Sequence, residues 1–496
     1  MATLADFACT DSEYLDVLIV GAGLSGIGAA WHLQDKCPGR SYAIVEAREQ
    51  SGGTWDLFRY PGIRSDSDMY TLGYSFRPWK DAKAIADGPA ILSYIRKVAS
   101  DHGIDARIRY GHRVVAASWS TSDARWTVEI EQGPGGEGGK RKLTLTCGFL
   151  WMCSGYYDYA AGYTPEFPEV ERFKGRIVHP QKWTEDIDYK DTRVVVIGSG
   201  ATAVTLVPAM APEAAHVTML QRSPTYVVAR PAEDSIANRL RRRLPIKLAY
   251  GLTRWKNVLL GMYFYQLCKR RPDRAKALIL KGVRYFLGPD YDVERHFTPR
   301  YNPWDQRLCL VPDADLFRAI RAKQVSVVTD QIDTFTETGI RLKSGRELEA
   351  DLIVTATGLA LQLLGGMTVE VDGKAINPAD TLAYKGMMYS DVPNFAVVSG
   401  YTNASWTLKA DLVCEYVCRL LNHMQKNGLR QCTPRLDEPD MERLPWVDFS
   451  SGYIQRAVDK FPKQGARRPW RLHQNYAMDL MSLRYGSVRD KAMVFS

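Results

Sequence analysis

Two stretches of the chain share one hydrophobic pattern, in which a short apolar run leads through a glycine-rich turn into small and apolar residues. The first runs from Val17–Val20 through Gly21–Gly26 to the neighbourhood of Gln34. The second runs from Val194–Ile197 through Gly198–Ala203 and continues as VTLVPAM. Short continuous apolar runs bounded by turns are typical of buried parallel strands. The pattern therefore predicts two strand–turn–helix units of the dinucleotide-binding type.

The first unit has the complete glycine pattern. Its three glycines permit a tight turn, a close approach to a pyrophosphate and close packing of helix on strand, with free N–H groups at the helix N-terminus. The next strand, Tyr42–Val45, ends in Glu46, about 20 residues after the last glycine, where an acid can accept hydrogen bonds from a ribose. A purely structural turn is the alternative. The residues expected to bind FAD here are Gly21, Gly23, Ser25, Gly26 and Glu46.

The second unit differs at the end of its second strand. Val217–Leu220 is followed by Gln221, Arg222 and Ser223, with no acid. A carboxylate there would repel a 2′-phosphate, whereas Arg222 and Ser223 can bind one through charge-assisted hydrogen bonds of about 1.5–3 kcal/mol each. One such bond corresponds to a preference of roughly tenfold to a hundredfold for NADPH over NADH. A solvated surface arginine is the alternative. The expected NADP-binding residues are Gly198, Ser199, Gly200, Ala201, Thr202, Ala203, Gln221, Arg222 and Ser223.

Two further patterns complete the expected fold. The apolar run Asp351–Gly358 reads as a buried parallel strand that returns the chain towards the first domain, and Trp126–Ile130 with Leu143–Cys147 reads as a hairpin whose Gly-rich tip, Gly133–Lys140, is an exposed loop. We expect an α/β fold with two Rossmann-like dinucleotide-binding domains and a helical insertion in the second. The expected boundaries are 1–150 and 381–496 for the FAD domain and the C-terminal region, 151–190 for the linker, 191–228 and 299–380 for the NADP domain, and 229–298 for the insert.

The excess of positive charge is confined to that insert. The chain of 496 residues has a net charge of +9, yet Arg239–Arg284 alone holds fourteen Lys and Arg against one acid, Asp273. The segment looks helical, and Val258–Leu267 is apolar enough to be buried. It could line a substrate pocket, lie on an anionic membrane surface or form a solvated helical face. Nucleic-acid binding is not expected, because the rest of the chain is slightly acidic and carries no recognition motif.

Several classes of protein are not expected from this sequence. The longest apolar run, Leu18–Trp31, is shorter than the roughly 20 residues needed to cross a bilayer, and Met1–Tyr14 lacks the apolar segment of a secretory signal. The nine cysteines include no C-x-x-C pair and no histidine at ligand spacing, so neither a metal site nor a disulfide scaffold is expected. We expect a cytoplasmic protein, with peripheral contact at the inner membrane face through the insert as an option.

The connector between the two units carries a motif. FKGRIVHPQKW, Phe173–Trp183, matches the pattern F-x-G-x-x-x-H-x-x-x-W of Baeyer–Villiger monooxygenases, a family of class B flavoprotein monooxygenases; Thr184 departs from the usual Pro or Asp. GGTWDLFRYPGIRSD resembles the family's other fingerprint, and NPWDQRLCLVPDADLF and GYTNASWTLKADLV make the chain most similar to the ethionamide-activating subgroup. The resemblance extends from about Leu15 to the C-terminal helical region. The fingerprint residues of the connector are Phe173, Gly175, His179 and Trp183.

This resemblance implies roles for residues that no local pattern marks. It places His179 on a hinge that couples NADPH binding to domain closure, rather than in acid or base chemistry. It also places Asn403 and Trp406 on a substrate-facing loop, although Trp406 could equally be a core residue. The further cofactor positions implied by the resemblance are Thr54, Trp55, Asp56, Asp66 and Val114 for FAD, and Arg64 and Ser65 for NADP.

The resemblance also implies the chemistry. In the family, FAD is reduced by NADPH and takes up O₂ as a C4a-peroxyflavin, which converts ketones to esters or lactones and can transfer oxygen to thioethers or thioamides. Arg307 matches the arginine that stabilises the developing negative charge, and Asp66 matches its acidic partner. Gln306 departs from the lysine often found before that arginine, so Arg222 would carry more of the NADPH preference.

Two other readings are compatible with paired dinucleotide units. A pyridine-nucleotide disulfide reductase would need a redox cysteine pair beside the flavin, yet Gly52-Gly53 is followed by Thr-Trp-Asp. The second is a non-enzymatic flavin- and NADPH-binding sensor. Steady NADPH consumption matched by oxygenated product would exclude the sensor.

Overall fold

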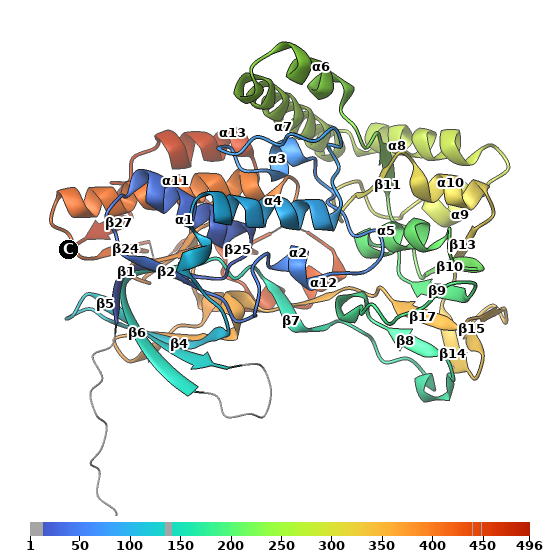
Figure 1. The fold of residues 1–496 in the computed structure, drawn as a ribbon, viewed down its shortest axis with the longest axis horizontal. Coiled ribbons are helices and arrows are strands. Elements are labelled where there is room, and N and C mark those ends of the chain that lie inside the picture. The colour runs from blue at the N-terminus through green and yellow to red at the C-terminus, as the bar shows by residue number, and fades with distance from the viewer. Residues whose placement is uncertain (1–12, 134–140, 439, 448) are drawn as a thin grey trace, which may run out of the picture.

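The computed structural model describes residues 13–133, 141–438, 440–447 and 449–496. Two α/β domains lie side by side, and a group of helices lies across the top of the second domain and the space between the two (Figure 1). Both sheets contain the strands expected from the two glycine-turn units. The expected fold class is confirmed.

The first sheet belongs to the N-terminal and C-terminal parts of the chain. Its strands are β1 (Tyr14–Val20), β2 (Tyr42–Val45), β3 (Ile108–Arg109), β4 (His112–Ser120), β5 (Arg125–Gln132), β6 (Arg141–Met152), β19 (Thr368–Val371), β20 (Lys374–Ala375) and β23 (Phe395–Val397). Within the described residues they run β20-β19-β4-β5-β6-β1-β2-β3, with β23 paired to β6. The hairpin of β5 and β6 is antiparallel as expected, and its tip, 134–140, lies outside the described residues.

Both faces of the first sheet are covered. The helices α1 (Leu24–Lys36), α4 (Gly88–Asp101) and α11 (Trp406–Lys426) pack with Val17 and Ile19 in one cluster. Leu18 and Val20 belong to a second cluster with residues of β4, β5 and β19. Burial on both faces is the reason that β1 reads as a continuous apolar run without alternation.

The chain returns to the first sheet earlier than the sequence boundary at residue 381. The strands β19 and β20 fall inside the interval 299–380 that was assigned to the NADP domain. In the structure β19 pairs in parallel with β4, and β20 pairs with β19. The short strands have too few residues for their sheet to be read from their apolar pattern.

The second sheet is entirely parallel. Its strands are β8 (Arg176–Val178), β9 (Arg193–Ile197), β10 (His216–Gln221), β13 (Val325–Thr329) and β17 (Leu352–Thr355), in the order β13-β10-β9-β17-β8. The helices α5 (Ala201–Met210) and α10 (Asp315–Arg321) lie on one face. On the other lies an antiparallel sheet of β14 (Ile332–Thr336), β15 (Gly339–Leu342) and β16 (Glu347–Glu349). The run predicted at Asp351–Gly358 contains β17, a buried parallel strand between β9 and β8.

The basic insert is helical, as the sequence predicts. It contains α6 (Ser235–Arg243), α7 (Ile246–Arg270), α8 (Pro272–Leu287) and α9 (Val293–Phe297), between the paired strands β11 (Val227–Arg230) and β12 (Cys309–Pro312). α7 packs on α3 (Met69–Leu72) of the first domain, and α8 packs on α10 of the second, so the insert bridges the two. No helix in the described part of the chain has the length and apolar character to span a membrane.

Two linkers cross between the domains side by side. β7 (Tyr157–Gly162) on the outward linker pairs antiparallel with β18 (Leu359–Leu361) on the return linker. The C-terminal region then packs on the first domain. Its elements, with the remaining short ones, are α2 (Thr54–Leu57), β21 (Ala383–Tyr384), β22 (Met388–Tyr389), β24 (Cys432–Pro434), β25 (Arg443–Leu444), α12 (Gly452–Gln455), β26 (Gln464–Gly465), α13 (Tyr476–Asp479), the π-helix η7 (Leu480–Tyr485) and β27 (Met493–Phe495).

Candidate active site

The first glycine turn leaves an open helix N-terminus at the edge of the first sheet. Gly23 is the N-cap of α1, and no side chain caps it. A Cβ on Gly26 would lie 1.9 Å from the carbonyl oxygen of Gly21, so only glycine allows the helix to lie this close to the turn. Glu46 is buried beside the turn, and its carboxylate accepts the backbone N–H of Ala22 at 2.7 Å. The free N–H groups and the adjacent acid fit the pyrophosphate and ribose of FAD.

Burial has a measurable effect on that acid. Desolvation raises the pKa of Glu46, and the two backbone N–H groups that its oxygens accept act in the opposite direction. Val114 lies close by on the buried side of β4, since the N–H of His112 at the start of that strand donates to the carbonyl oxygen of Glu46 at 2.9 Å. The structure therefore places Glu46 and Val114 at the same edge of the sheet.

The second glycine turn is also open. Gly200 is the N-cap of α5 without a capping side chain, and a Cβ built on it meets no atom within 4 Å. The hydroxyl of Ser199 donates to the carbonyl oxygen of Ser223 at 3.2 Å, which holds the segment after β10 beside the turn. Arg222 is exposed on this segment and has no ion-pair partner among the described residues. This arrangement fits a dinucleotide phosphate at the helix N-terminus and a cation beyond it.

Gln221 is buried, whereas the next residue, Arg222, is exposed. The side-chain amide of Gln221 donates to the carbonyl oxygen of His296 and to the hydroxyl of Thr329, each at 2.8 Å. These bonds fasten β10 to the end of the insert and to β13. The side chain of Gln221, expected at the nucleotide, is thus directed into the second domain.

The loop that carries the second fingerprint fastens the first domain to α5. The hydroxyl of Tyr60 forms a hydrogen bond with Thr202, at the start of that helix. Gly62 has a φ of +74°, and a Cβ on it would lie 2.5 Å from the Cβ of Ala209. Arg64 forms an ion pair with Asp315 of α10 at 2.5 Å. The loop therefore holds Asp66, at its end, beside the second domain.

The two expected catalytic residues meet there. The Nε of Arg307 lies 3.2 Å from Oδ2 of Asp66, and their side chains are 41% and 16% exposed. Desolvation acts to lower the pKa of Arg307, but the Asp66 carboxylate and the nearby phenols of Tyr453, Tyr157 and Tyr156 outweigh it and raise that pKa. The guanidinium is therefore a cation at any working pH.

Arg307 and Asp66 line a cavity of about 180 Å³. Asn257, Val258 and Met262 of α7 form part of its wall, which favours the pocket-lining reading of the insert over a wholly solvated face. Asn403 also lines it; its Nδ2 donates to the carbonyl oxygen of Gln474 at 2.9 Å, and its buried Oδ1 has no partner in the described residues.

Trp406 does not line this cavity. Its indole N–H donates to the hydroxyl of Ser25 at 2.8 Å, and its ring packs on Tyr156 with centroids 5.3 Å apart. It is the first residue of α11 and connects that helix to the first glycine turn. Its position therefore matches the FAD-binding turn, and not the substrate loop for which Asn403 was also expected.

The residues after Gly52-Gly53 form a short helix, α2, whose acid, Asp56, forms ion pairs with two arginines. The buried Asp56 carboxylate pairs with Arg48 at 2.7 Å and with Arg96 at 2.8 Å. The hydroxyl of Thr54 lies 3.2 Å from that of Tyr159 on the linker strand β7. Trp55 packs partly buried on the first core cluster, and the buried hydroxyl of Ser65 accepts the N–H of Ser67 at 2.9 Å.

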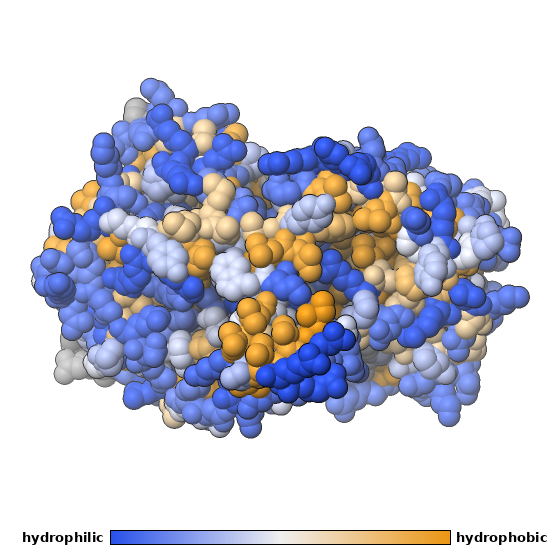
Figure 2. All heavy atoms as spheres, turned by 90° about the horizontal axis from the view of Figure 1, so that it is seen from above, coloured by the Kyte–Doolittle hydropathy of each residue, from blue (hydrophilic) through white to orange (hydrophobic). Residues whose placement is uncertain are grey.

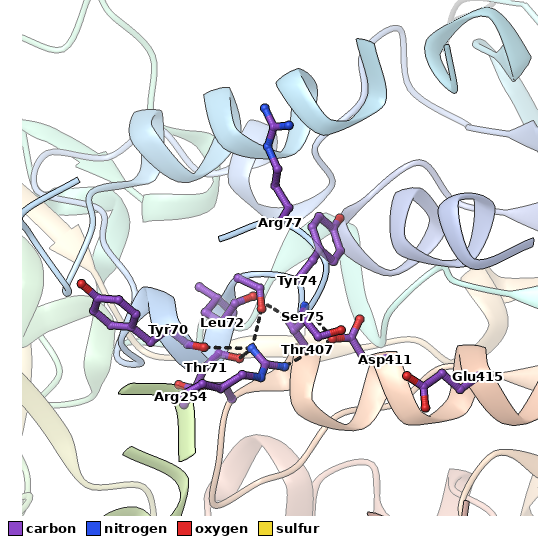
Figure 3. A network of polar contacts seen from close by, with 12 residues as sticks. Tyr70, Thr71, Leu72, Tyr74, Ser75, Arg77, Arg254, Thr407, Asp411 and Glu415 are labelled. Atoms are coloured by element: carbon purple, nitrogen blue, oxygen red, sulfur yellow. Dashed lines mark hydrogen bonds and ion pairs between the residues drawn. The ribbon is translucent and has the colours of Figure 1, made fainter. Parts of the chain in front are cut away.

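A buried arginine holds α7 against the first domain (Figure 3). Arg254 donates to the carbonyl oxygens of Tyr70 at 2.8 Å and Gly73 at 2.7 Å, which follow the residues Asp66 to Asp68 of the cavity wall. Its other terminal nitrogen lies 3.3 Å from Asp411 of α11, whose second oxygen lies 3.4 Å from Nε2 of His32. This network connects the insert, the segment after Asp66 and two helices of the first domain. It therefore holds the α7 wall of the cavity against the segment that follows Asp66.

The fingerprint histidine joins the two linkers. His179 donates from Nε2 to the carbonyl oxygen of Gly358 at 3.1 Å and accepts at Nδ1 the backbone N–H of Gln181 at 3.2 Å. Desolvation lowers the pKa of His179, so the neutral ring is favoured. Phe173 is buried and packs on Phe335. A Cβ on Gly175 would lie 2.5 Å from the ring of Phe173, so only glycine fits beside it. Trp183 is half-buried and packs on Tyr189. The whole motif is a structural joint at the base of the second domain.

Comparison with known proteins agrees with this geometry. Residues 76–249 match the family model of the flavin-binding monooxygenase-like proteins, and residues 19–86 match that of the NAD(P)-binding Rossmann-like domain. The FAD-containing monooxygenase EthA of Mycobacterium tuberculosis (strain ATCC 25618 / H37Rv) is 57% identical over 486 residues, 98% of each chain. The chain belongs to the FAD-containing monooxygenase family.

More distant members agree. The probable FAD-binding monooxygenase AlmA of Acinetobacter sp is 48% identical over 97% of this monooxygenase and 96% of its own chain. Among solved structures, an oxidised steroid monooxygenase bound to NADP has a TM-score of 0.73 at 22% identity, covering 97% of this chain and 99% of its own. Cyclohexanone monooxygenase with ε-caprolactone has a TM-score of 0.74 at 20% identity, covering 98% and 100%. The resemblance drawn from the fingerprints is confirmed, and the disulfide-reductase and sensor readings are wrong.

Some residues of this monooxygenase site could not be recognised from the sequence. Tyr453 lies near Arg307 and forms a hydrogen bond with it, yet it comes from the C-terminal region and follows no motif. In the sequence, Arg254 cannot be distinguished from the other basic residues of the insert. Both are positioned by contacts between segments far apart in the chain, which a local pattern does not encode.

Proposed function

We propose that this monooxygenase consumes NADPH and O₂ and inserts one oxygen atom into small ketones, giving esters or lactones. The observation that carries the proposal is the Arg307–Asp66 pair, 3.2 Å apart, on the wall of a cavity of about 180 Å³, in a chain that also has two open dinucleotide turns. FAD, once reduced by NADPH, supplies the activation of O₂. The chain's own residues must bind the two nucleotides, hold the ketone and stabilise the negative charge that develops on its carbonyl oxygen.

Arg307 is the residue placed to stabilise charge. When a carbonyl carbon is attacked, negative charge develops on its oxygen, and a fixed cation lowers the energy of that transition state. The Asp66 carboxylate orients the guanidinium and keeps it protonated. The neighbours of Arg307 come from the first domain, the linker and the C-terminal region, so the geometry depends on the relative placement of all three.

The nucleotide preference is assigned to the second turn. Arg222 is exposed, unpaired within the described residues and held near the turn by the bond between Ser199 and Ser223. A cation without a protein partner at this position is available to a 2′-phosphate. NADPH is therefore the proposed reductant in preference to NADH.

Oxygen transfer to thioethers or thioamides is a second proposed activity of the same cavity. Attack by a sulfur lone pair places no negative charge on a carbonyl oxygen, so it depends less on Arg307 than ketone oxidation does. A panel of ketones and thioethers, with NADPH loss and oxygenated product followed together, tests the proposal. Product formed in proportion to NADPH consumed supports it, whereas NADPH loss with hydrogen peroxide as the only product across the panel contradicts it.

A further inference from the structure

The outer side of α7 carries an unusual row of apolar residues. Leu248, Leu252, Trp255, Leu259 and Tyr263 are 51%, 47%, 43%, 57% and 70% exposed. Their spacing of three or four residues places them along one side of the helix. Single exposed apolar residues are ordinary on a protein surface, but a continuous row marks a surface that binds something. We call these five residues the α7 face.

The apolar surface continues onto a neighbouring segment. The rings of Trp255 and Tyr476 meet edge to face with centroids 5.7 Å apart, so α13 lies beside α7. Met481 and Tyr485 in the following π-helix are 63% and 65% exposed. The view from above the insert shows apolar side chains gathered in a patch with strongly hydrophilic ones directly beside it (Figure 2).

Cations lie at one end of the α7 face. Arg239, Arg242 and Arg243 in α6 and Lys247 in the first turn of α7 are exposed, and none of the four has an ion pair within the described ranges. The acids in and near α6 that could oppose them are Glu233, which binds Asn238, and Asp234, which pairs with Lys256. The combination is an apolar stripe with aromatic residues and a group of unpaired positive charges at one end.

We propose that this surface docks the monooxygenase on an anionic lipid bilayer. An anionic bilayer complements both parts, because the apolar stripe enters the headgroup boundary and the cations lie among the anionic headgroups. A second copy of the chain fits less well, since a two-fold contact through this face would cover the apolar stripe but offer the cations only the acids in and near α6, which already have partners. The same helix supplies the cavity wall through Asn257, Val258 and Met262. Docking would therefore bring the cavity to within one helix of the lipid.

Flotation of the full-length, FAD-loaded protein with lipid vesicles tests this surface. The vesicles contain phosphatidylcholine alone or with roughly one third phosphatidylglycerol. We expect flotation only with the anionic vesicles, weakened by salt. The charge variant R239Q/R242Q/R243Q/K247Q should lose at least roughly a hundredfold in partition. The apolar variant L252S/L259S should lose roughly tenfold.

Matched variants elsewhere on the surface act as controls. K343Q/R346Q removes two exposed cations of the second domain, and I177S removes a 37% exposed apolar side chain of β8. Both controls should float like the unmodified protein. Because flotation needs no turnover, its result does not depend on the proposed ketone oxidation. Absence of flotation with anionic vesicles, or equal loss in variants and controls, overturns the proposal. So does a concentration-dependent dimer in sedimentation velocity that L252S/L259S abolishes, because the face then binds a second copy.

Discussion

Arg222 is the residue expected to determine the preference for NADPH over NADH. Replacing Arg222 with alanine removes an exposed cation that pairs with no acid in the described part of the chain, so folding should be unaffected while a 2′-phosphate loses its charge-assisted bonds. We expect the KM for NADPH to rise roughly tenfold to a hundredfold and the KM for NADH to change little. Steady-state kinetics with both nucleotides measure this. An equal rise for both would show that Arg222 does not bind the phosphate, and R222K should retain most of the preference.

The sequence predicts residues in turns better than residues whose partners are distant. The glycines and Glu46 act through their own turn and strand, so a local motif is sufficient to find them. Gln221 and Trp406 are different, because their hydrogen-bond partners, His296 and Ser25, come from segments that only the folded chain brings near. The same is true of Asn403, whose unpartnered oxygen becomes visible only when Gln474 is placed beside it.

At the scale of elements, the docking of α7 depends on a buried charge. Asp411 is 4% exposed in its side chain and lies against Arg254, which is 9% exposed. Replacing Asp411 with asparagine leaves that arginine buried without its counter-charge, which should cost about 3–5 kcal/mol of unfolding free energy. Urea unfolding of the FAD-loaded protein measures the loss. The matched control is Arg341→Ala, which breaks an exposed pair with Asp333 and should cost less than about 1 kcal/mol.

A loss in D411N no larger than that in R341A would contradict the assigned role of the network. A loss of stability accompanied by a raised KM for ketones would support it further, because the same network holds the α7 wall of the cavity. Neither Arg254 nor Asp411 could be predicted as partners, since one lies in the insert and the other in α11.

The linker pair β7 and β18 should respond to pH through His179. Its pKa is lowered from the ordinary 6.5 by desolvation, so the folded protein binds fewer protons than the unfolded chain as pH falls through that value. Its contribution to stability is therefore complete above about pH 6.5 and is lost at lower pH. His179→Gln keeps a donor for Gly358 and cannot titrate.

Thermal unfolding between pH 5 and 8 measures this contribution. We expect the unmodified protein to lose stability relative to H179Q as the pH falls below the ordinary histidine value. The half-buried side chains of His296 and His473, whose pKa values are also lowered by desolvation, occur in both proteins and cancel in the difference. Parallel curves for the two proteins would show that His179 does not titrate with folding.

At the scale of the whole molecule, the order of motifs predicted two dinucleotide domains and a helical insert. The chain's return to the first sheet through β19 was not predictable, because that strand has four residues and its partner β4 is far away in the sequence. The insert was recognisable by its charge. A cavity wall was one of three open readings of the insert, and the lining residues Asn257, Val258 and Met262 of α7 support it, while the membrane reading is carried by the docking proposal.

The residues of the site come from three segments that lie far apart in the sequence. Arg307 comes from the chain's return after the insert, Asp66 from the first domain and Tyr453 from the C-terminal region. The Arg307–Asp66 geometry therefore depends on how these segments are placed relative to one another. The two linkers joined by His179 connect the two domains, so their movement would change this placement.

The most direct test of the account replaces Arg307 with alanine and separates the two halves of the reaction. Rapid mixing without O₂ follows flavin reduction by NADPH, and turnover with a ketone in air follows ester formation. We predict that R307A retains FAD and is reduced by NADPH at nearly the normal rate, while ester formation falls by roughly a hundredfold to a thousandfold or more. Normal ester yield in R307A would contradict the central claim that this guanidinium stabilises the charge formed during oxygen insertion.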